Sequence, residues 1–141
     1  LVVVCHALTG NHLTYGTNDQ PGWWRGIIDG GYMPINDYQF LTFNVIGSPY
    51  GSSSALTDAD FPQTLTLRDI VRAIEIGIET LGFEHINILI GGSLGGMQAI
   101  ELLYNRKFKR VRFKQVIERF RREKNLSIHF YGSYSKYGAL I

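Results

Sequence analysis

The chain has 141 residues, enough for one domain with its own core, and its 45% hydrophobic and 18% charged residues are typical of a globular protein. Its single cysteine, Cys5, excludes an internal disulfide, and no apolar run is long enough to span a bilayer. The net charge of +2 conceals two parts: residues 1–105 carry three basic and ten acidic side chains, whereas residues 106–141 carry 11 basic and two acidic ones. We therefore expect a core over residues 1–105 and a separate basic tail over residues 106–141.

The first half of the chain is predicted to contain two strands separated by a long loop. Leu1–Cys5 is a short β-branched run that enters the loop His6–Gly10. Residues 9–39 are rich in Gly, Asn, Asp and Thr, and we expect a loop there with one short helix around Trp23–Ile28. Phe40–Ile46 is predicted to be the second strand, which stops at Gly47-Ser48-Pro49.

The second half is predicted to alternate helix and strand. Thr66 is a suitable N-cap, with Asp69 as the acid of a capping box, for a helix that starts at Leu67 and ends at Gly82. The apolar side chains that we expect this helix to bury are Ile70, Ile74, Ile78 and Leu81. The segments that follow are a strand over Ile86–Ile90, a turn over Gly91–Gly96 and a helix over Met97–Tyr104. The fold class is therefore α/β, with a parallel sheet and helices on both of its faces.

Ser93 lies in the turn Gly91-Gly92-Ser93-Leu94-Gly95, between a predicted strand and a predicted helix. Such a turn holds a serine in a strained conformation and presents its hydroxyl above the sheet edge, where it can act as a nucleophile. The amide of Leu94, at the start of the helix, can then donate to an oxyanion. The second oxyanion donor in such sites comes from the loop after an earlier strand, and Leu8 is the predicted donor in this chain.

These residues allow two other interpretations. Gly91–Gly96 could be only a tight strand-to-helix connection or a phosphate-binding loop, but no lysine follows the glycines and the spacing differs from a P-loop. His6 precedes the nucleophile, whereas the usual order in this fold is serine, then acid, then histidine. We therefore expect His6 to order its loop through backbone hydrogen bonds rather than to act as the base, and we expect the same of His12 and His85.

Several separate blocks, in one order, resemble the homoserine O-acetyltransferase family, and most of all its members from low-GC Gram-positive bacteria. The blocks are CHALTGN at Cys5–Asn11, PGWW at Pro21–Trp24, FNVIGSPYGSSS at Phe43–Ser54, FPQTLTLRDIV at Phe61–Val71 and GGSLGGMQAIE at Gly91–Glu101. The resemblance covers residues 1–105. It implies a partial α/β-hydrolase fold that is truncated after the nucleophile helix.

The resemblance also implies a reaction. Ser93 would take an acetyl group from acetyl-CoA, a co-substrate rather than a cofactor, and L-homoserine would collect it for methionine biosynthesis. Leu8 and Leu94 match the oxyanion-hole positions of the family. The family is cytoplasmic and commonly dimeric, so we expect a cytoplasmic protein whose full-length form is a homodimer, with no metal and no membrane contact.

The tail departs from the family pattern after Asn105. The only later histidine is His129, and the only later acids are Glu118 and Glu123, with too little chain between them to build the family's remaining strands. We therefore assign no catalytic acid or base in this chain and expect it to be inactive, or nearly so, on its own.

Two alternative functions remain open. A serine esterase or other hydrolase of the same fold would pass the acyl group to water instead of to homoserine. The ten basic residues among positions 106–124 could also bind nucleic acid or a membrane surface, and residues 107–124 could form a basic amphipathic helix. We favour an out-of-frame tail without a selected role over this binding module, because basic runs are common and unspecific.

Overall fold

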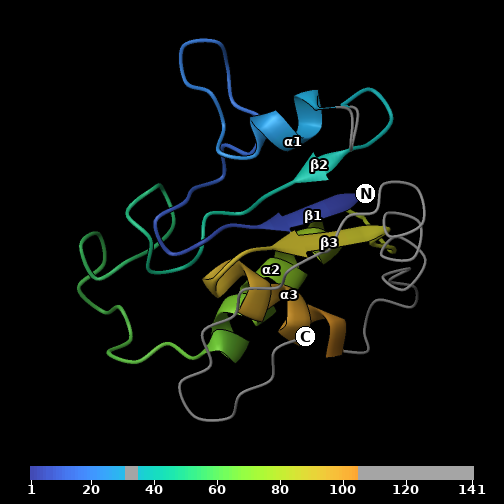
Figure 1. Cartoon of the computed structure of the whole chain (residues 1–141). Coiled ribbons are helices and arrows are strands. Elements are labelled where there is room, and N and C mark those ends of the chain that lie inside the picture. The colour runs from blue at the N-terminus through green and yellow to red at the C-terminus, as the bar shows by residue number, and fades with distance from the viewer. Residues whose placement is uncertain (31–34, 105–141) are drawn as a thin grey trace.

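The computed structural model describes residues 1–30 and 35–104, and the expected basic tail over residues 106–141 lies outside them (Figure 1). The elements in chain order are β1 (Val2–Cys5), α1 (Arg25–Asp29), β2 (Phe40–Leu41), α2 (Leu67–Thr80), β3 (Ile88–Gly91) and α3 (Leu94–Tyr104).

The three strands form one parallel sheet in the order β2-β1-β3. Val2 pairs with Phe40 on one side of β1 and with Ile88 on the other, and at the far end Cys5 pairs with Gly91. Because the strands are parallel, the loops that follow them all leave the sheet at the same edge. The predicted α/β class with a parallel sheet is thus confirmed.

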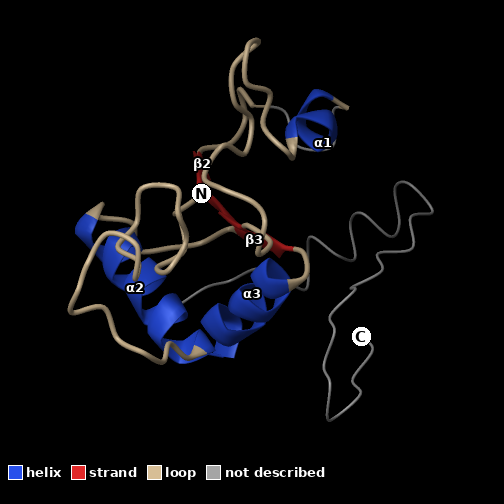
Figure 2. Ribbon diagram, turned by 90° about the vertical axis from the view of Figure 1, so that its left-hand side faces the viewer, coloured by secondary structure: helices blue, strands red, loops and turns tan. Residues whose placement is uncertain are grey.

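The sheet separates two apolar clusters. Figure 2 shows α2 and α3 on one side of the sheet and α1 on the other. The larger cluster packs α2 and α3 against the sheet, and its buried members are Val3, Cys5, Val71, Ile74, Ile78, Ile86, Leu89, Ala99 and Leu102. The smaller cluster, Val2, Val4 and Ile88, packs against Trp24, Tyr38, Phe40 and Ile90. Burial on both faces explains why the strands are apolar at successive positions.

Helix α2 begins as the sequence predicts. The Thr66 side chain accepts a hydrogen bond from the Asp69 N–H at 3.3 Å, and the Asp69 carboxylate accepts one from the Thr66 N–H at 2.8 Å, which completes a capping box. The expected burial of Leu81 is wrong, because its side chain is 55% exposed. The expected burial of Ile74 and Ile78 is confirmed, and Val71 and Glu75 complete the buried stripe. Leu81 follows the last helical residue, Thr80, as the C-cap of α2.

Two predicted boundaries differ in ways that matter for the site. Strand β2 ends at Leu41 rather than at Ile46, because the following backbone bonds to side chains of another loop: the Val45 N–H donates to His6 instead of to a strand. Helix α3 begins at Leu94, three residues before the predicted start, so the helix follows Ser93 directly. Strand β3 lies two residues later at its start and one residue later at its end than predicted.

Candidate active site

Ser93 connects β3 to α3 in a left-handed conformation. Its φ of +57° is the one positive value among the described residues other than glycine. A side chain in this region costs about 1–2 kcal/mol, so the surrounding structure must hold it there. The Ser93 carbonyl accepts the Met97 N–H at 3.2 Å and so starts the hydrogen bonds of α3. The serine is exposed, which leaves its hydroxyl open to a reactant.

The two glycines that flank this serine leave no room for a side chain. A Cβ atom on Gly91 would lie 2.1 Å from the Gly95 carbonyl oxygen, and one on Gly95 would lie 2.0 Å from the Cys5 carbonyl oxygen. Both neighbours are backbone atoms that cannot rotate away. The sharp turn and the close approach of α3 to β1 therefore require glycine at these two positions, as the motif predicts.

The loop after β1 forms a tight turn beside the serine turn. The Gly10 N–H donates to the Ala7 carbonyl at 2.9 Å, which places Leu8 and Thr9 at the two central positions. Because Cys5 pairs with Gly91, this loop and the serine turn leave adjacent strands at the same edge of the sheet. The α3 backbone also meets the end of β1, since a Cβ on Gly95 would lie 2.8 Å from the His6 carbonyl oxygen.

Backbone amides from both loops are available as donors. In the described part of the chain, neither the Leu8 N–H nor the Leu94 N–H donates a hydrogen bond to another residue. Leu94 is the first residue of α3, whose N-terminal end carries the positive end of the helix dipole. Two free amides and a serine hydroxyl at one sheet edge could serve acyl transfer as oxyanion donors and nucleophile, and such a transfer also requires a base.

The three histidines of the described residues occupy different settings. His6 is buried, with Nδ1 2.7 Å from the Ala7 carbonyl and Nε2 accepting the Val45 N–H at 3.1 Å. The expectation that His6 orders its loop through backbone hydrogen bonds is thereby confirmed. His12 is exposed and bonds Asn44, whereas His85 precedes β3, at the opposite end of that strand from Ser93.

Asn44 and Val45 have a role that the sequence pattern does not predict. The Asn44 carboxamide accepts the His12 N–H at 2.8 Å, and the next residue, Val45, donates to His6. Two successive residues of the loop after β2 therefore hold both ends of the loop that carries Leu8. The signal was present as a polar asparagine within the apolar run FNVI, which marks the point where the strand has already ended.

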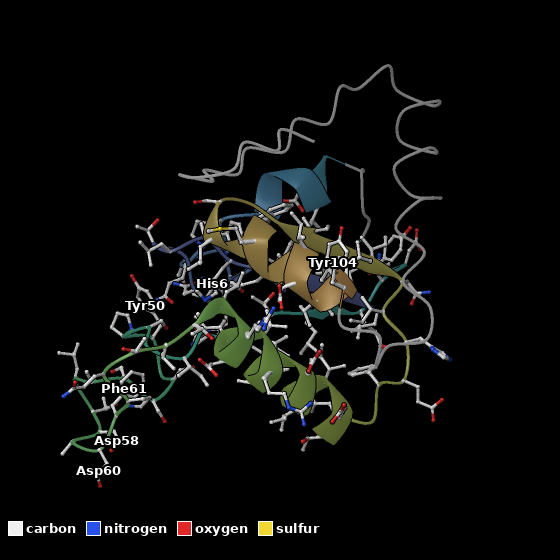
Figure 3. The ribbon with its side chains drawn as sticks, turned by 90° about the horizontal axis from the view of Figure 1, so that it is seen from below. His6, Tyr50, Asp58, Asp60, Phe61 and Tyr104 are labelled. Carbon is white, nitrogen blue, oxygen red and sulfur yellow. The ribbon has the colours of Figure 1, made fainter. Side chains whose placement is uncertain are left out.

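The outer loops lie at this same edge. Figure 3 shows His6 and Tyr50 toward one end of the molecule, with Asp58, Asp60 and Phe61 farther out on the segment before α2, and Tyr104 at the other end of α3.

Cys5 offers no second nucleophile, because burial raises the pKa of its thiol to about 12.

The described residues contain no group of three or more His, Cys, Asp or Glu side chains that could hold a metal ion. Within the same part of the chain, no helix has the length and apolar character needed to cross a membrane.

A family model described as the alpha/beta hydrolase fold matches residues 1–113. The chain belongs to the alpha/beta hydrolase fold family. Within this family it is similar to the crystal structure of homoserine O-acetyltransferase from Staphylococcus aureus, with 75% identity and a TM-score of 0.74 over 77% of this chain and 33% of that one. It is also 36% identical to homoserine O-acetyltransferase of Nautilia profundicola, over 71% of this chain and 31% of that protein.

A second functional class occurs among the solved structures that this chain matches. The crystal structure of an esterase is 25% identical, with a TM-score of 0.59 over 70% of this chain and 32% of the esterase. The chain spans about a third of the length of these relatives. The match to the family model over residues 1–113 includes the serine turn and the loop after β1.

Proposed function

We propose that this chain carries the nucleophile part of an acyltransferase of the homoserine O-acetyltransferase type. The observation that supports it most strongly is the left-handed Ser93 between β3 and α3, on a chain that is 75% identical to a homoserine O-acetyltransferase over 77% of its length. In this proposal Ser93 is the nucleophile, and the Leu8 and Leu94 amides form the oxyanion hole.

The reaction would proceed in two transfers. The Ser93 hydroxyl oxygen attacks the thioester carbonyl of acetyl-CoA while a base removes the hydroxyl proton, and the two amides stabilise the negative oxygen of the tetrahedral intermediate. The carbon–sulfur bond then breaks, and the coenzyme A thiolate leaves and takes a proton. The hydroxyl of L-homoserine attacks the acetyl-serine in the same way, which forms O-acetylhomoserine and restores the serine.

The base and its acid partner are not supplied by the described residues in this proposal. Both ring nitrogens of His6 face backbone groups, and His85 lies at the wrong end of its strand. A serine hydroxyl without a histidine base is a poor nucleophile at neutral pH. We therefore expect little or no turnover from residues 1–141 alone, while His129, Glu118 and Glu123 lie outside the described residues.

The test compares the 141-residue chain with a hybrid. In the hybrid, residues 1–104 replace the matching third of the Staphylococcus aureus enzyme. Release of coenzyme A thiol from acetyl-CoA is followed with and without homoserine. We expect turnover from the hybrid and none from its Ser93→Ala variant. The isolated 141-residue chain should release coenzyme A thiol no faster than the Ser93→Ala hybrid does. An active Ser93→Ala hybrid would refute the role of the serine, and a turnover of the isolated chain that this substitution abolishes would refute its inactivity.

An esterase is the second candidate, supported by the structural similarity to a solved esterase. The two candidates differ in the acceptor of the acyl group. A transferase releases O-acetylhomoserine when homoserine is present, whereas an esterase releases acetate at the same rate with or without it. The cytoplasmic location and the homodimer implied by the family resemblance remain predictions. Nucleic-acid binding by the tail remains the disfavoured alternative.

A further inference from the structure

The Ala7 carbonyl accepts two hydrogen bonds at once. One comes from the Gly10 N–H at 2.9 Å and closes the turn, and the other comes from the His6 ring at 2.7 Å. The ring atom in this contact is Nδ1. Nε2 of the same ring faces the Val45 N–H at 3.1 Å, and a backbone N–H can only donate. The ring proton must therefore be on Nδ1, where it points at the Ala7 carbonyl.

The Ala7 carbonyl and the Leu8 N–H belong to the same peptide unit. A trans peptide is planar, with its C=O and N–H pointing in opposite directions. Two hydrogen bonds that fix the Ala7 carbonyl therefore also fix the direction of the Leu8 N–H. The Leu8 side chain is 75% exposed and contributes little packing of its own, so the backbone bonds must set this direction.

The imidazole of His6 is itself held firmly. The residue is 1% exposed, and Gly10 approaches it so closely that an added Cβ there would lie 3.0 Å from the His6 Cβ. The Val45 N–H fixes the far side of the ring at Nε2. The ring is packed and bonded at both nitrogens. It therefore connects Val45, in the loop after β2, to the Ala7–Leu8 peptide and holds that peptide in a fixed orientation.

We propose that His6 is a positioning residue that aims the Leu8 amide at the oxyanion, through the Ala7 carbonyl. The inference rests on the proposed role of Leu8 in acyl transfer. His6 touches no reacting atom and exchanges no proton during the reaction. Its contribution is to prevent rotation of the Ala7–Leu8 peptide, so that the donor already points at the site where negative charge develops.

Two substitutions separate positioning from simple filling of the buried space. His6→Asn keeps an N–H at the position of Nδ1, within reach of the Ala7 carbonyl, but cannot reach Val45. His6→Gln places its amide at the distance of Nε2, where it can accept the Val45 N–H, but leaves the Ala7 carbonyl without its second donor. His6→Leu removes both bonds. The exposed His85, at the far end of β3, provides the matched control His85→Asn.

The first measurement uses the whole 141-residue chain and does not depend on activity. Long-range nitrogen–proton NMR correlations of the His6 ring report which nitrogen carries the proton, and we expect Nδ1. We also expect the Leu8 amide resonance to shift strongly in His6→Gln and His6→Leu, less in His6→Asn and not at all in His85→Asn. A proton on Nε2, or a Leu8 amide that does not respond to His6→Gln, would overturn the inference.

The second measurement uses the hybrid enzyme. We expect His6→Gln to lower kcat by about 10- to 100-fold, approaching the effect of losing one oxyanion donor, with the KM for acetyl-CoA nearly unchanged. His6→Asn should retain more activity than His6→Gln. Equal losses in both variants, or losses that follow thermal stability alone, would mean that His6 only fills space. An inactive unsubstituted hybrid would count against the proposed function. The NMR measurement would still show whether His6 sets the direction of the Leu8 N–H.

Discussion

Gly95 and Gly96 are adjacent glycines in the first turn of α3, and the structure predicts opposite effects of alanine at the two positions. A Cβ on Gly95 would lie 2.0 Å from the Cys5 carbonyl oxygen, whereas one on Gly96 would lie 3.4 Å from the Gly91 carbonyl oxygen. Carbon and carbonyl oxygen normally approach no closer than about 3.3 Å. Gly95→Ala therefore requires α3 and β1 to separate by about 1 Å, while Gly96→Ala requires no movement.

The free energy of unfolding should change accordingly. Overpacking destabilises a protein by about 1–3 kcal/mol. Gly95→Ala should cost an amount near the upper end of this range, because its Cβ would clash with backbone atoms of Cys5 in the central strand β1. Gly96→Ala removes a helical glycine and should stabilise the chain by about 0.5–1 kcal/mol. The two variants should therefore differ by roughly 3–4 kcal/mol, a large part of the stability of a small domain.

Urea unfolding, followed by tryptophan fluorescence and by circular dichroism, measures this difference. The two variants have the same composition, so their unfolded states are closely matched and the comparison isolates the contact with Cys5. If Gly95→Ala were as stable as Gly96→Ala, the close approach of α3 to the end of β1 would be wrong, and with it the geometry of the serine turn.

Three further predictions concern single side chains. Thr66→Ala should cost about 1 kcal/mol through the lost cap. The Thr66 side-chain hydrogen bond, and then its backbone hydrogen bond, lower the pKa of Asp69, so the stability that comes from the ionised carboxylate is present above the unfolded pKa and is lost as the pH falls through the folded pKa. Thr66→Ala keeps the backbone N–H that bonds Asp69, so unfolding measured across the acid range should show a weaker pH dependence in this variant. Both side-chain polar atoms of Gln98 are buried without a hydrogen-bond partner among residues 1–30 and 35–104, so Gln98→Met should raise the melting temperature, and a lowered one would indicate a partner for the amide. Cys5, with a pKa of about 12, should resist thiol reagents at pH 8 in the folded chain and react after unfolding in urea; rapid labelling of the folded chain would contradict its burial.

The sequence predicted the features that depend on local chemistry. The capping box at Thr66 and Asp69 needs only two side chains three residues apart, and the serine turn needs only its glycines between a strand and a helix. Both are present in the structure. The predicted end of the second strand at Ile46 was wrong, because an apolar run does not show where its backbone stops pairing with a neighbouring strand.

The site could be predicted in part for the same reason. The positions of Ser93 and of the Leu8 loop follow from the order of strand, loop and turn along the chain. The bond from Val45 to His6 joins residues 39 positions apart, and periodicity carries no information about such a contact. The sequence therefore predicted that His6 bonds to backbone without revealing which backbone groups it joins.

In the proposed reaction, Ser93 accepts the acetyl group. The most direct measurement is mass spectrometry of the hybrid after brief exposure to acetyl-CoA without homoserine, followed by peptide mapping. We predict one acetyl group on the peptide that contains Ser93, which is lost on addition of homoserine and is absent from Ser93→Ala. An acetyl group on any other residue of an active hybrid, or an active Ser93→Ala hybrid, would contradict it.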